Sequence, residues 1–229
     1  MIIGINGYSG SGKDTVGLII QYLLCSHEHP AVSLDDVLKK PEDHQWWLEE
    51  QSKWEVKKWA GKLKDIASIL TGIPKHNFED QEFKKTNLGP EWDCNPWGKT
   101  GTMHKQPLSV REFLQRVGTD ALRDGLHTNT WVNALMADYQ PLDFDPLTEA
   151  EINPNWIITD TRFINEAQAI KEAGGIVIRI DRPGVKPINN HPSEIELDNW
   201  NFDYKIANVS DVLSLSLAVI TVLKKIKIL

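Results

Sequence analysis

A glycine-rich stretch near the start of the chain ends in a lysine followed by two residues with side-chain oxygens. Residues 7–15 read Gly-Tyr-Ser-Gly-Ser-Gly-Lys-Asp-Thr and follow the apolar run Met-Ile-Ile-Gly-Ile. Glycines let a backbone turn sharply and bring successive N–H groups close to the oxygens of a polyphosphate. The N-terminus of a following helix would face the same oxygens. The pattern predicts a strand, a phosphate loop (residues 7–15) and a helix, and it indicates a protein that handles a nucleoside triphosphate.

The lysine and the two residues after it are the candidates for contact with the transferred phosphate and a metal ion. Lys13 is expected to reach the phosphate that moves. In loops of this kind a Ser or Thr follows the lysine and holds Mg²⁺, whereas this chain has Asp14 there and Thr15 one step later. Because Mg²⁺ prefers oxygen ligands, either residue would serve. The alternative is an accidental glycine-rich turn, which the order of strand, loop and helix signals disfavours.

A carboxylate and an arginine follow a second apolar run. Residues 156–160 read Trp-Ile-Ile-Thr-Asp, which is typical of a buried parallel strand that ends at the carboxyl edge of a sheet. Asp160 is therefore expected to hold the shell of the metal ion or to orient the phosphate acceptor, unless it only caps the next turn. The planar guanidinium of Arg162 suits a phosphate, unless it forms a surface ion pair with Glu166.

A polar segment with three prolines and a glycine, residues 181–192, follows a third apolar run. This composition predicts a lid. Arg182, near its start, would close over the transferred phosphate or remain a solvated loop residue.

The sequence His-Pro-Ser-Glu at residues 191–194 lies at the end of this lid and just after it. These residues could position the donor or the acceptor. They equally fit the capped start of a helix, because Ser193 precedes Glu196 by the capping-box interval.

A predicted helix in the middle of the chain, over residues 110–122, carries several polar side chains. Arg111, Gln115 and Thr119 are four residues apart and would share one helical face. Such a stripe can line a pocket, or it can be the exposed face of an amphipathic helix. Trp131, farther along, could stack on a base or be an ordinary core residue.

The spacing of apolar residues along the chain predicts alternating strands and helices. The expected helices cover residues 15–25, 54–70, 110–122, 130–139, 165–172 and 211–225, and the expected strands lie at residues 1–5, 156–160, 176–180 and 204–208. This alternation predicts an α/β protein with the three-layer P-loop NTPase fold, in which a parallel sheet lies between helices.

One long stretch departs from that alternation. Residues 34–105 are charged, rich in Trp and Lys, and broken by prolines, and residues 87–105 read as a loop. We therefore expect one kinase-like domain over residues 1–229, with a mainly helical lobe inserted at residues 34–105 that binds the acceptor.

Composition excludes several classes of function. The 229 residues carry a formal net charge of −7 without a long basic cluster, so polymeric nucleic acid is not an expected partner. Cys25 and Cys94 are far apart and indicate neither a disulfide framework nor a zinc site. Apolar stretches are shorter than the ~18 residues of a membrane span, and the first strand leaves no room for a signal peptide. The expected location is the cytoplasm, away from membranes.

In these residues the chain resembles the phage-type deoxynucleoside monophosphate kinases, a branch of the P-loop nucleoside monophosphate kinase superfamily. The resemblance covers nearly the whole chain. It is carried by residues 7–15, 63–65, 111–123, 160–166 and 191–194 and by the segment around Trp131. The loop alone also occurs in animal phosphomevalonate kinases, so the combination is the specific signal. It implies phosphorylation of a small-molecule deoxynucleoside monophosphate by ATP with Mg²⁺, in the host cytoplasm if a phage encodes the protein.

The resemblance also implies roles for individual residues. The residues that would bind ATP are Gly10, Ser11, Gly12, Lys13, Asp14 and Thr15. The residues that would bind the acceptor are Lys64, Arg111, Gln115, Arg123, Trp131 and Arg162, with Gln115 and Trp131 beside the base. The expected metal ligands are Asp14, Thr15 and Asp160, and the expected catalytic residues are Lys13, Asp160, Arg162 and Arg182.

Two other functions remain open from the sequence. The first is another P-loop small-molecule kinase, acting on phosphomevalonate or dephospho-coenzyme A. The second is a non-catalytic module in which ATP binding orders residues 87–105 for a partner protein. A sensor needs no second phosphate site, so Asp160, Arg162 and Arg182 argue against it. The expected assembly is a monomer or a homodimer.

Overall fold

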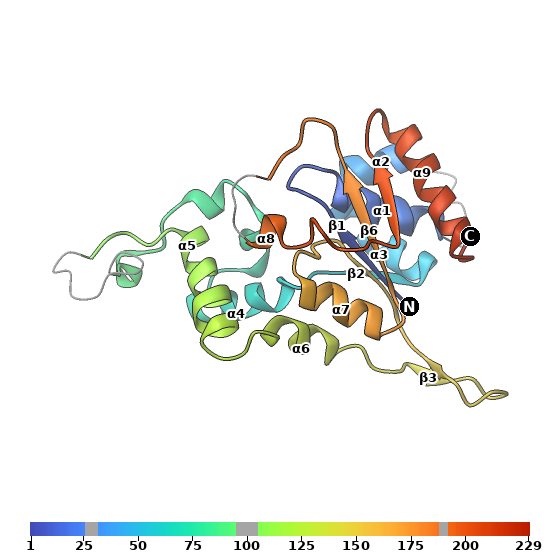
Figure 1. Cartoon of the computed structure of the whole chain (residues 1–229). Coiled ribbons are helices and arrows are strands. Elements are labelled where there is room, and N and C mark those ends of the chain that lie inside the picture. Colours follow the sequence, from blue (N-terminus) through green and yellow to red (C-terminus); the bar gives the residue numbers. More distant parts are fainter. Residues whose placement is uncertain (26–31, 95–104, 188–191) are drawn as a thin grey trace. The chain divides into compact units, whose positions relative to one another are not determined.

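The computed structural model describes residues 1–25, 32–94, 105–187 and 192–229, which form two compact units (Figure 1). Unit 1 combines residues 1–59 with residues 136–229, and unit 2 consists of residues 60–135. Most of the loop expected at residues 87–105, and the part of the expected lid at residues 188–191, lie outside the described residues.

A five-stranded parallel sheet forms the centre of unit 1. Its order is β2 (Trp54–Lys57), β5 (Asn155–Ile158), β1 (Ile2–Asn6), β6 (Ile176–Asp181) and β7 (Tyr204–Ala207). Gly4 pairs with Ile158 on one side and with Val177 on the other, so the first strand of the chain is the central one. The parallel sheet predicted from the apolar runs is confirmed.

Helices and one short hairpin complete unit 1. They are α1 (Lys13–Leu23), α2 (Leu34–Lys39), α3 (Pro41–Ser52), the hairpin of β3 (Asp143–Phe144) and β4 (Glu151–Ile152), α7 (Ile164–Glu172), α8 (Pro192–Ile195) and α9 (Val212–Lys225). Helix α1 contacts α2, α3 and α9. Within the described part of the chain, no helix is both long and apolar enough to cross a membrane.

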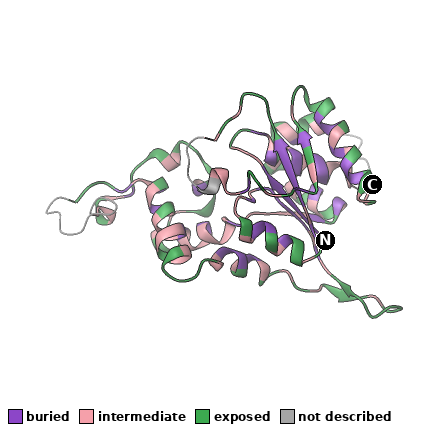
Figure 2. Cartoon of the chain, viewed as in Figure 1, coloured by how far each residue is buried: buried purple, intermediate pink, exposed green. Residues whose placement is uncertain are grey.

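The two faces of the sheet are covered by different helices. Successive residues of a strand face opposite sides of a sheet. Ile3 and Ile5 of β1 belong to one buried cluster with residues of α1 and α9. Between them, a Cβ on Gly4 would lie 2.4 Å from Cδ1 of Ile170 in α7, so α7 covers the other face. The three inner strands β1, β5 and β6 are accordingly the buried ones (Figure 2).

Unit 2 is helical and has its own buried core. Its elements are α4 (Gly61–Thr71), the 3-10 helices η1 (Lys75–Glu79), η2 (Phe83–Lys85) and η3 (Pro90–Trp92), α5 (Val110–Gln115), the π-helix η4 (Arg116–Asp124) and α6 (Thr130–Met136), which ends at the boundary of the unit. The core consists of Ala67, Phe78, Leu88, Leu108, Val110 and Phe113.

One predicted element is wrong. Residues 54–70, expected as a single helix, form strand β2 and then helix α4. Trp54 and Val56 pack on the core beside α1, and their backbone pairs with β5. Their two-residue alternation is that of a strand, but together with the apolar residues that follow it also fits helical spacing.

Two boundaries also differ from expectation. The helix expected over residues 110–122 is an α-helix only as far as Gln115 and then becomes a π-helix, so the spacing argument holds for Arg111 and Gln115 but not for Thr119. Helices α2 and α3 belong to unit 1, so the second compact unit begins at residue 60, whereas the lobe was expected to begin at residue 34.

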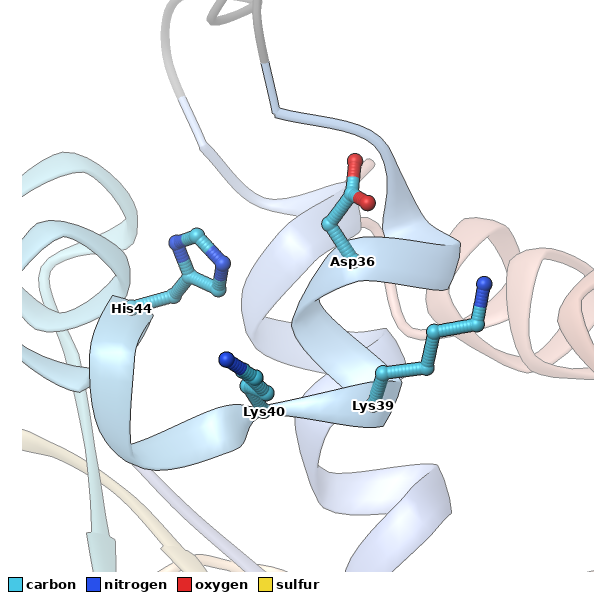
Figure 3. A pocket seen from close by; sticks show the side chains of 4 residues that line it. All are labelled: Asp36, Lys39, Lys40 and His44. Carbon is cyan, nitrogen blue, oxygen red and sulfur yellow. The ribbon is translucent and has the colours of Figure 1, made fainter.

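A hollow of about 370 Å³ lies on the helix pair α2 and α3 (Figure 3). It is lined by Asp36, Lys39, Lys40 and His44. Asp36 accepts a hydrogen bond from the Ser33 hydroxyl and Lys39 pairs with Asp35, so these side chains stabilise the helix pair itself. None of the site residues expected from the sequence lies on α2 or α3.

We expect Gly17→Ala to destabilise unit 1. Alanine normally favours a helix over glycine by about 1 kcal/mol. Here α1 approaches the end of β5 so closely that the added Cβ would lie 2.7 Å from Thr159 Cγ2. Overpacking of this kind costs about 1–3 kcal/mol, which urea denaturation would measure as a lower free energy of unfolding.

The matched control for that variant is Thr159→Ser, which removes the methyl group and keeps the hydroxyl. In the Thr159→Ser background, Gly17→Ala should cost much less. An equal cost in both backgrounds would contradict the close approach of α1 to this residue.

Candidate phosphate-binding site

The phosphate loop joins β1 to α1 in a conformation that glycine allows. Gly10 and Gly12 have φ values of 81° and 99°, in the left-handed region that other residues rarely adopt. A Cβ on Gly12 would also lie 2.7 Å from Nδ2 of Asn208, the residue after β7. That amide donates to the Ser11 carbonyl at 2.9 Å, so a neighbouring strand end holds the loop.

Lys13 is buried against the loop that precedes it. The residue is 9% exposed, and its Nζ donates to the carbonyls of Gly7 at 2.7 Å and Tyr8 at 2.8 Å. Burial, together with the nearby charge of Arg162, lowers the pKa of Lys13 to about 8. The loop therefore holds its cation in place by its own backbone.

Arg162 brings a second cation to the carboxyl edge, two residues after Asp160, and its charge helps to lower the pKa of Lys13. Its Nη1 donates to Glu194 Oε1 at 3.1 Å. The Glu166 carboxylate instead accepts from the backbone N–H groups of Arg162 at 2.7 Å and Phe163 at 3.1 Å, at the start of α7. The side-chain ion pair is thus formed with Glu194, and Glu166 fixes the backbone.

Asp160 lies just beyond the carboxyl end of β5, as its place after an apolar run predicts. Its Oδ1 accepts from the backbone N–H of Trp59 at 2.9 Å, and the Trp59 indole donates to Thr161 Oγ1 at 3.4 Å. The amide of Asn6, the last residue of β1, donates to the Thr161 carbonyl at 2.8 Å. These contacts join the carboxyl ends of β1, β2 and β5 at one edge of the sheet.

Asp14 lies in the first turn of α1 and is bound from two sides. Its Oδ1 accepts from Thr159 Oγ1 at 2.7 Å and lies 3.4 Å from Lys58 Nζ. Loss of hydration alone would raise the pKa of Asp14, but the charge of Lys58 and the Thr159 hydrogen bond outweigh it, and the pKa lies below its usual value. The helix thus begins with an ionised carboxylate, followed by the partly exposed Thr15.

Arg182 contacts the phosphate loop directly. Its Nη1 donates to the Gly10 carbonyl at 3.3 Å, and the residue is exposed. The arginine expected to begin the lid therefore lies at the loop, and its closure over a phosphate stays a prediction.

A buried arginine on β6 contacts the Tyr8 side chain of the phosphate loop. Arg179 is 6% exposed, and its guanidinium carbon lies 4.3 Å from the centre of the Tyr8 ring. It donates to Asn6 Oδ1 at 2.5 Å, Asp181 Oδ1 at 3.0 Å and Asp198 Oδ1 at 3.3 Å. The Tyr8 hydroxyl donates to the same Asp198 oxygen at 2.9 Å, so this cluster fixes the loop through the side chain of Tyr8.

Apart from Arg162, which belongs to unit 1, the polar residues expected to bind the acceptor lie in unit 2. Lys64 is buried in α4 and pairs with Glu79. Arg111 and Gln115 are exposed on α5, and Arg123 is half-exposed in the π-helix. Three of the four expected cationic residues, Lys64, Arg111 and Arg123, thus lie in unit 2, and their contact with the acceptor stays a prediction.

Trp131 is buried in α6, and its indole N–H donates to the Gly118 carbonyl at 2.8 Å. This contact is the one expected of a core residue. A place for Trp131 beside the base stays a prediction.

Several residues of the site gave no functional signal in the sequence. Lys58 fell within the helix wrongly predicted over residues 54–70, and recognition of β2 would have placed it at the carboxyl edge. Arg179 interrupts an apolar strand, and a charged residue in such a run is a usable signal because buried charges need partners. Asp198 has no local signal, since Tyr8 and Arg179 are distant in sequence.

The fold and this site define a class of protein. A glycine-rich phosphate loop joins the first strand of a parallel sheet to the first helix, and two cations lie beside it. This is the site of a P-loop kinase. A family model described as deoxynucleotide monophosphate kinase matches residues 78–219.

Relatives of known description agree with that match. The chain is 31% identical over 206 residues to a putative deoxynucleotide monophosphate kinase of Acanthamoeba polyphaga mimivirus, with 86% of this chain and 82% of that protein covered. It is 25% identical over 245 aligned positions to the deoxynucleoside-5'-monophosphate kinase of Escherichia phage T5, with 92% and 90% covered. A deoxynucleotide monophosphate kinase of Enterobacteria phage T4 is 31% identical over 100 residues, with 44% and 39% covered.

The chain belongs to the deoxynucleotide monophosphate kinase family. The resemblance drawn from the sequence motifs is confirmed, and a phosphotransferase is supported over a non-catalytic sensor.

Lys13 is expected to titrate near pH 8 in the free protein, below the ordinary lysine pKa of 10.5. Because an anionic ligand binds the protonated amine, its affinity should fall as the pH rises through about 8. A ¹³C NMR titration of the lysine Cε resonances measures the pKa, and the spectrum of Lys13→Met identifies the signal. A Lys13 resonance that titrates together with those of exposed lysines would contradict the burial of its charge.

Proposed function

We propose that the protein transfers the γ-phosphoryl group of ATP to the phosphate of a deoxynucleoside monophosphate, giving ADP and a deoxynucleoside diphosphate. Family membership supports the reaction class. The observation that carries the proposal is the glycine-rich loop between β1 and α1, which holds Lys13 Nζ through the Gly7 and Tyr8 carbonyls and is contacted by Arg182 at the Gly10 carbonyl. Like charges at one loop repel in the free protein, and a polyphosphate stabilises both.

The donor would bind to the phosphate loop. Its phosphates would take the place of the Gly7 and Tyr8 carbonyls as partners of Lys13 Nζ, and they would accept from the loop N–H groups. Arg162 would contact the transferred group, and Arg182, already at the loop, would close over it. The remaining loop residues proposed to contact ATP are Gly10, Ser11, Gly12, Asp14 and Thr15.

Two residues at the start of α1 and one just after β5 fit Mg²⁺. Asp14, Thr15 and Asp160 offer carboxylate and hydroxyl oxygens, which this ion prefers. No ready-made cluster of three or more His, Cys, Asp or Glu occurs in the described ranges, so one or two carboxylates would share the ion with phosphate oxygens, as is typical of Mg²⁺. When bound, the ion neutralises charge on the phosphates. In the free protein Lys58 balances the Asp14 carboxylate.

The reaction asks for alignment and charge neutralisation more than for proton transfer. An acceptor phosphate oxygen is already anionic near neutral pH, so its attack needs no strong base. Lys13 and Arg162 would stabilise the charge that spreads over the transferred group. Asp160, held by the Trp59 N–H, would orient the acceptor or the water shell of the metal ion.

The acceptor is proposed to bind in the lobe expected at residues 34–105 together with the helix that follows it. Lys64, Arg111 and Arg123 would bind its phosphate, with Gln115 and Trp131 beside the base. Residues 181–192 would form the lid. The net charge of −7 favours a single nucleotide over a polymeric nucleic acid as substrate.

The test is a coupled assay of ADP release with ATP and Mg²⁺. The acceptors are dAMP, dGMP, dTMP and dCMP, with the corresponding ribonucleotides and with phosphomevalonate and dephospho-coenzyme A as comparisons. Turnover of one or more deoxynucleotides supports the proposal and names the base. Turnover of only the last two acceptors, or ATP binding without turnover of any, would overturn it.

Lys13→Ala should lower kcat/KM by about 10²- to 10³-fold, the loss that follows deletion of one preorganised electrostatic donor. Lys39→Ala is the matched control, because this lysine is exposed on α2 and pairs with the exposed Asp35 one turn earlier. Circular dichroism would confirm that both variants fold. Near-normal turnover by folded Lys13→Ala would show that Lys13 does not hold the transferred phosphate.

A further inference from the structure

A buried carboxylate holds one of the two cations of the site. Glu194 lies in α8, and its side chain is 9% exposed, whereas that of Arg162 is 39% exposed. Glu194 Oε1 accepts from Arg162 Nη1 at 3.1 Å. Its second oxygen, Oε2, is buried and has no hydrogen-bond partner among the described residues. Arg162 is thus a direct ion-pair partner of the buried carboxylate.

Because it is costly to bury a carboxylate, Glu194 depends strongly on its contact with Arg162. An ionised carboxylate away from water is strongly unfavourable unless it is paired. The carboxylate is the buried partner and the guanidinium the more exposed one, so Glu194 constrains Arg162 more than the reverse. Since only Nη1 is used in this contact, the fork of the guanidinium keeps further N–H donors that suit phosphate oxygens.

Arg162 is fixed at its other end as well. Its backbone N–H donates to Glu166 Oε2 at 2.7 Å, at the start of α7. With the backbone held by Glu166 and Nη1 held by Glu194, the side chain between them has little freedom. A cation fixed in this way needs no reorganisation when charge develops on a phosphate.

The carboxylate also lies close to the phosphate loop. The charge of Glu194 raises the pKa of Lys13, while burial and the charge of Arg162 lower it. The three side chains therefore act on one another, although Glu194 is more than 180 residues after Lys13 in the chain.

We propose that Glu194 is a positioning residue for phosphoryl transfer, which holds the Arg162 guanidinium so that its remaining N–H groups face the phosphates. The proposal rests on the proposed function for its kinetic consequence. Glu194 itself touches no reacting atom and acts through Arg162.

The same segment offers a matched control. Glu196 Oε1 accepts from the backbone N–H of Ile164 at 2.9 Å, at the start of α7, so Glu196 joins this segment to the same helix without contacting a cation of the site. Glu194→Gln and Glu196→Gln remove equal charge from one short stretch. A role confined to holding the segment in place would make the two variants alike.

The experiment is a double-mutant cycle between Glu194→Gln and Arg162→Ala, with Glu196→Gln as control. Glu194→Gln should lower kcat by about 10- to 100-fold, with a smaller change in KM for ATP, because a cation displaced by an ångström can cost up to about 100-fold. Glu194→Asp, which keeps the charge, should recover part of the rate. In the Arg162→Ala background, Glu194→Gln should have no further effect on kcat.

Three results would overturn the proposal. They are an unchanged kcat in Glu194→Gln, the same fold-loss with and without Arg162, and an equal loss in Glu196→Gln. Circular dichroism and thermal melting would verify that each variant folds.

A binding measurement separates this proposal from the proposed function. If the wild-type protein fails to turn over any deoxynucleotide, the proposed function falls. The role of Glu194 is then decided by calorimetry of ATP binding in EDTA. Weaker binding in Glu194→Gln that disappears in the Arg162→Ala background supports the positioning role, and equal affinities in all variants overturn it.

Discussion

Positive charge brought to one edge of the sheet is the constraint around which unit 1 is arranged. Lys13 and Arg162 act on each other across the carboxyl edge of the sheet, and each depends on groups from other elements. The loop carbonyls hold Lys13, and the Glu194 carboxylate of α8 holds Arg162. The carboxyl edge of a parallel sheet makes this possible because several strand ends, distant in sequence, meet there.

The phosphate loop is shaped by its surroundings before a ligand arrives. Asn208 holds the loop carbonyl of Ser11, and Arg179 and Asp198 hold the side chain of Tyr8. Burial of the Arg179 charge is costly, and its hydrogen bonds with Asn6, Asp181 and Asp198 offset that cost. A loop held this firmly loses little further freedom on binding, which favours affinity for a phosphate.

The parts of the structure that sequence could predict are those with a local cause. The apolar runs of β1, β5 and β6 identified the sheet, and the order of strand, loop and helix placed Lys13. Strand β2 was not predicted because it has only four residues, in which apolar Trp54 and Val56 alternate with charged residues. The apolar residues that follow continue at helical spacing, so the whole segment was predicted as one helix.

The site was predictable only in part, for the same reason. Arg162 was found from its place after an apolar run, but its partner could not be. Glu194 is 32 residues later, and only the folded chain brings the two together. The change from α-helix to π-helix after Gln115 is likewise absent from the pattern, since the residues on both sides have helical spacing.

The order of the strands has a consequence for how the chain is made. Ile3 of the central strand pairs with Ile157 and Ile176, which leave the ribosome 154 and 173 residues later. Unit 2 is continuous in sequence and is complete before either neighbour of β1 exists. During synthesis the apolar strand β1 therefore has no neighbouring strand on either edge until β5 is made. A strand with unpaired edges can pair wrongly with other chains. Truncated products that end before β6 retain one such edge on the buried apolar strand β1, which makes them prone to aggregate.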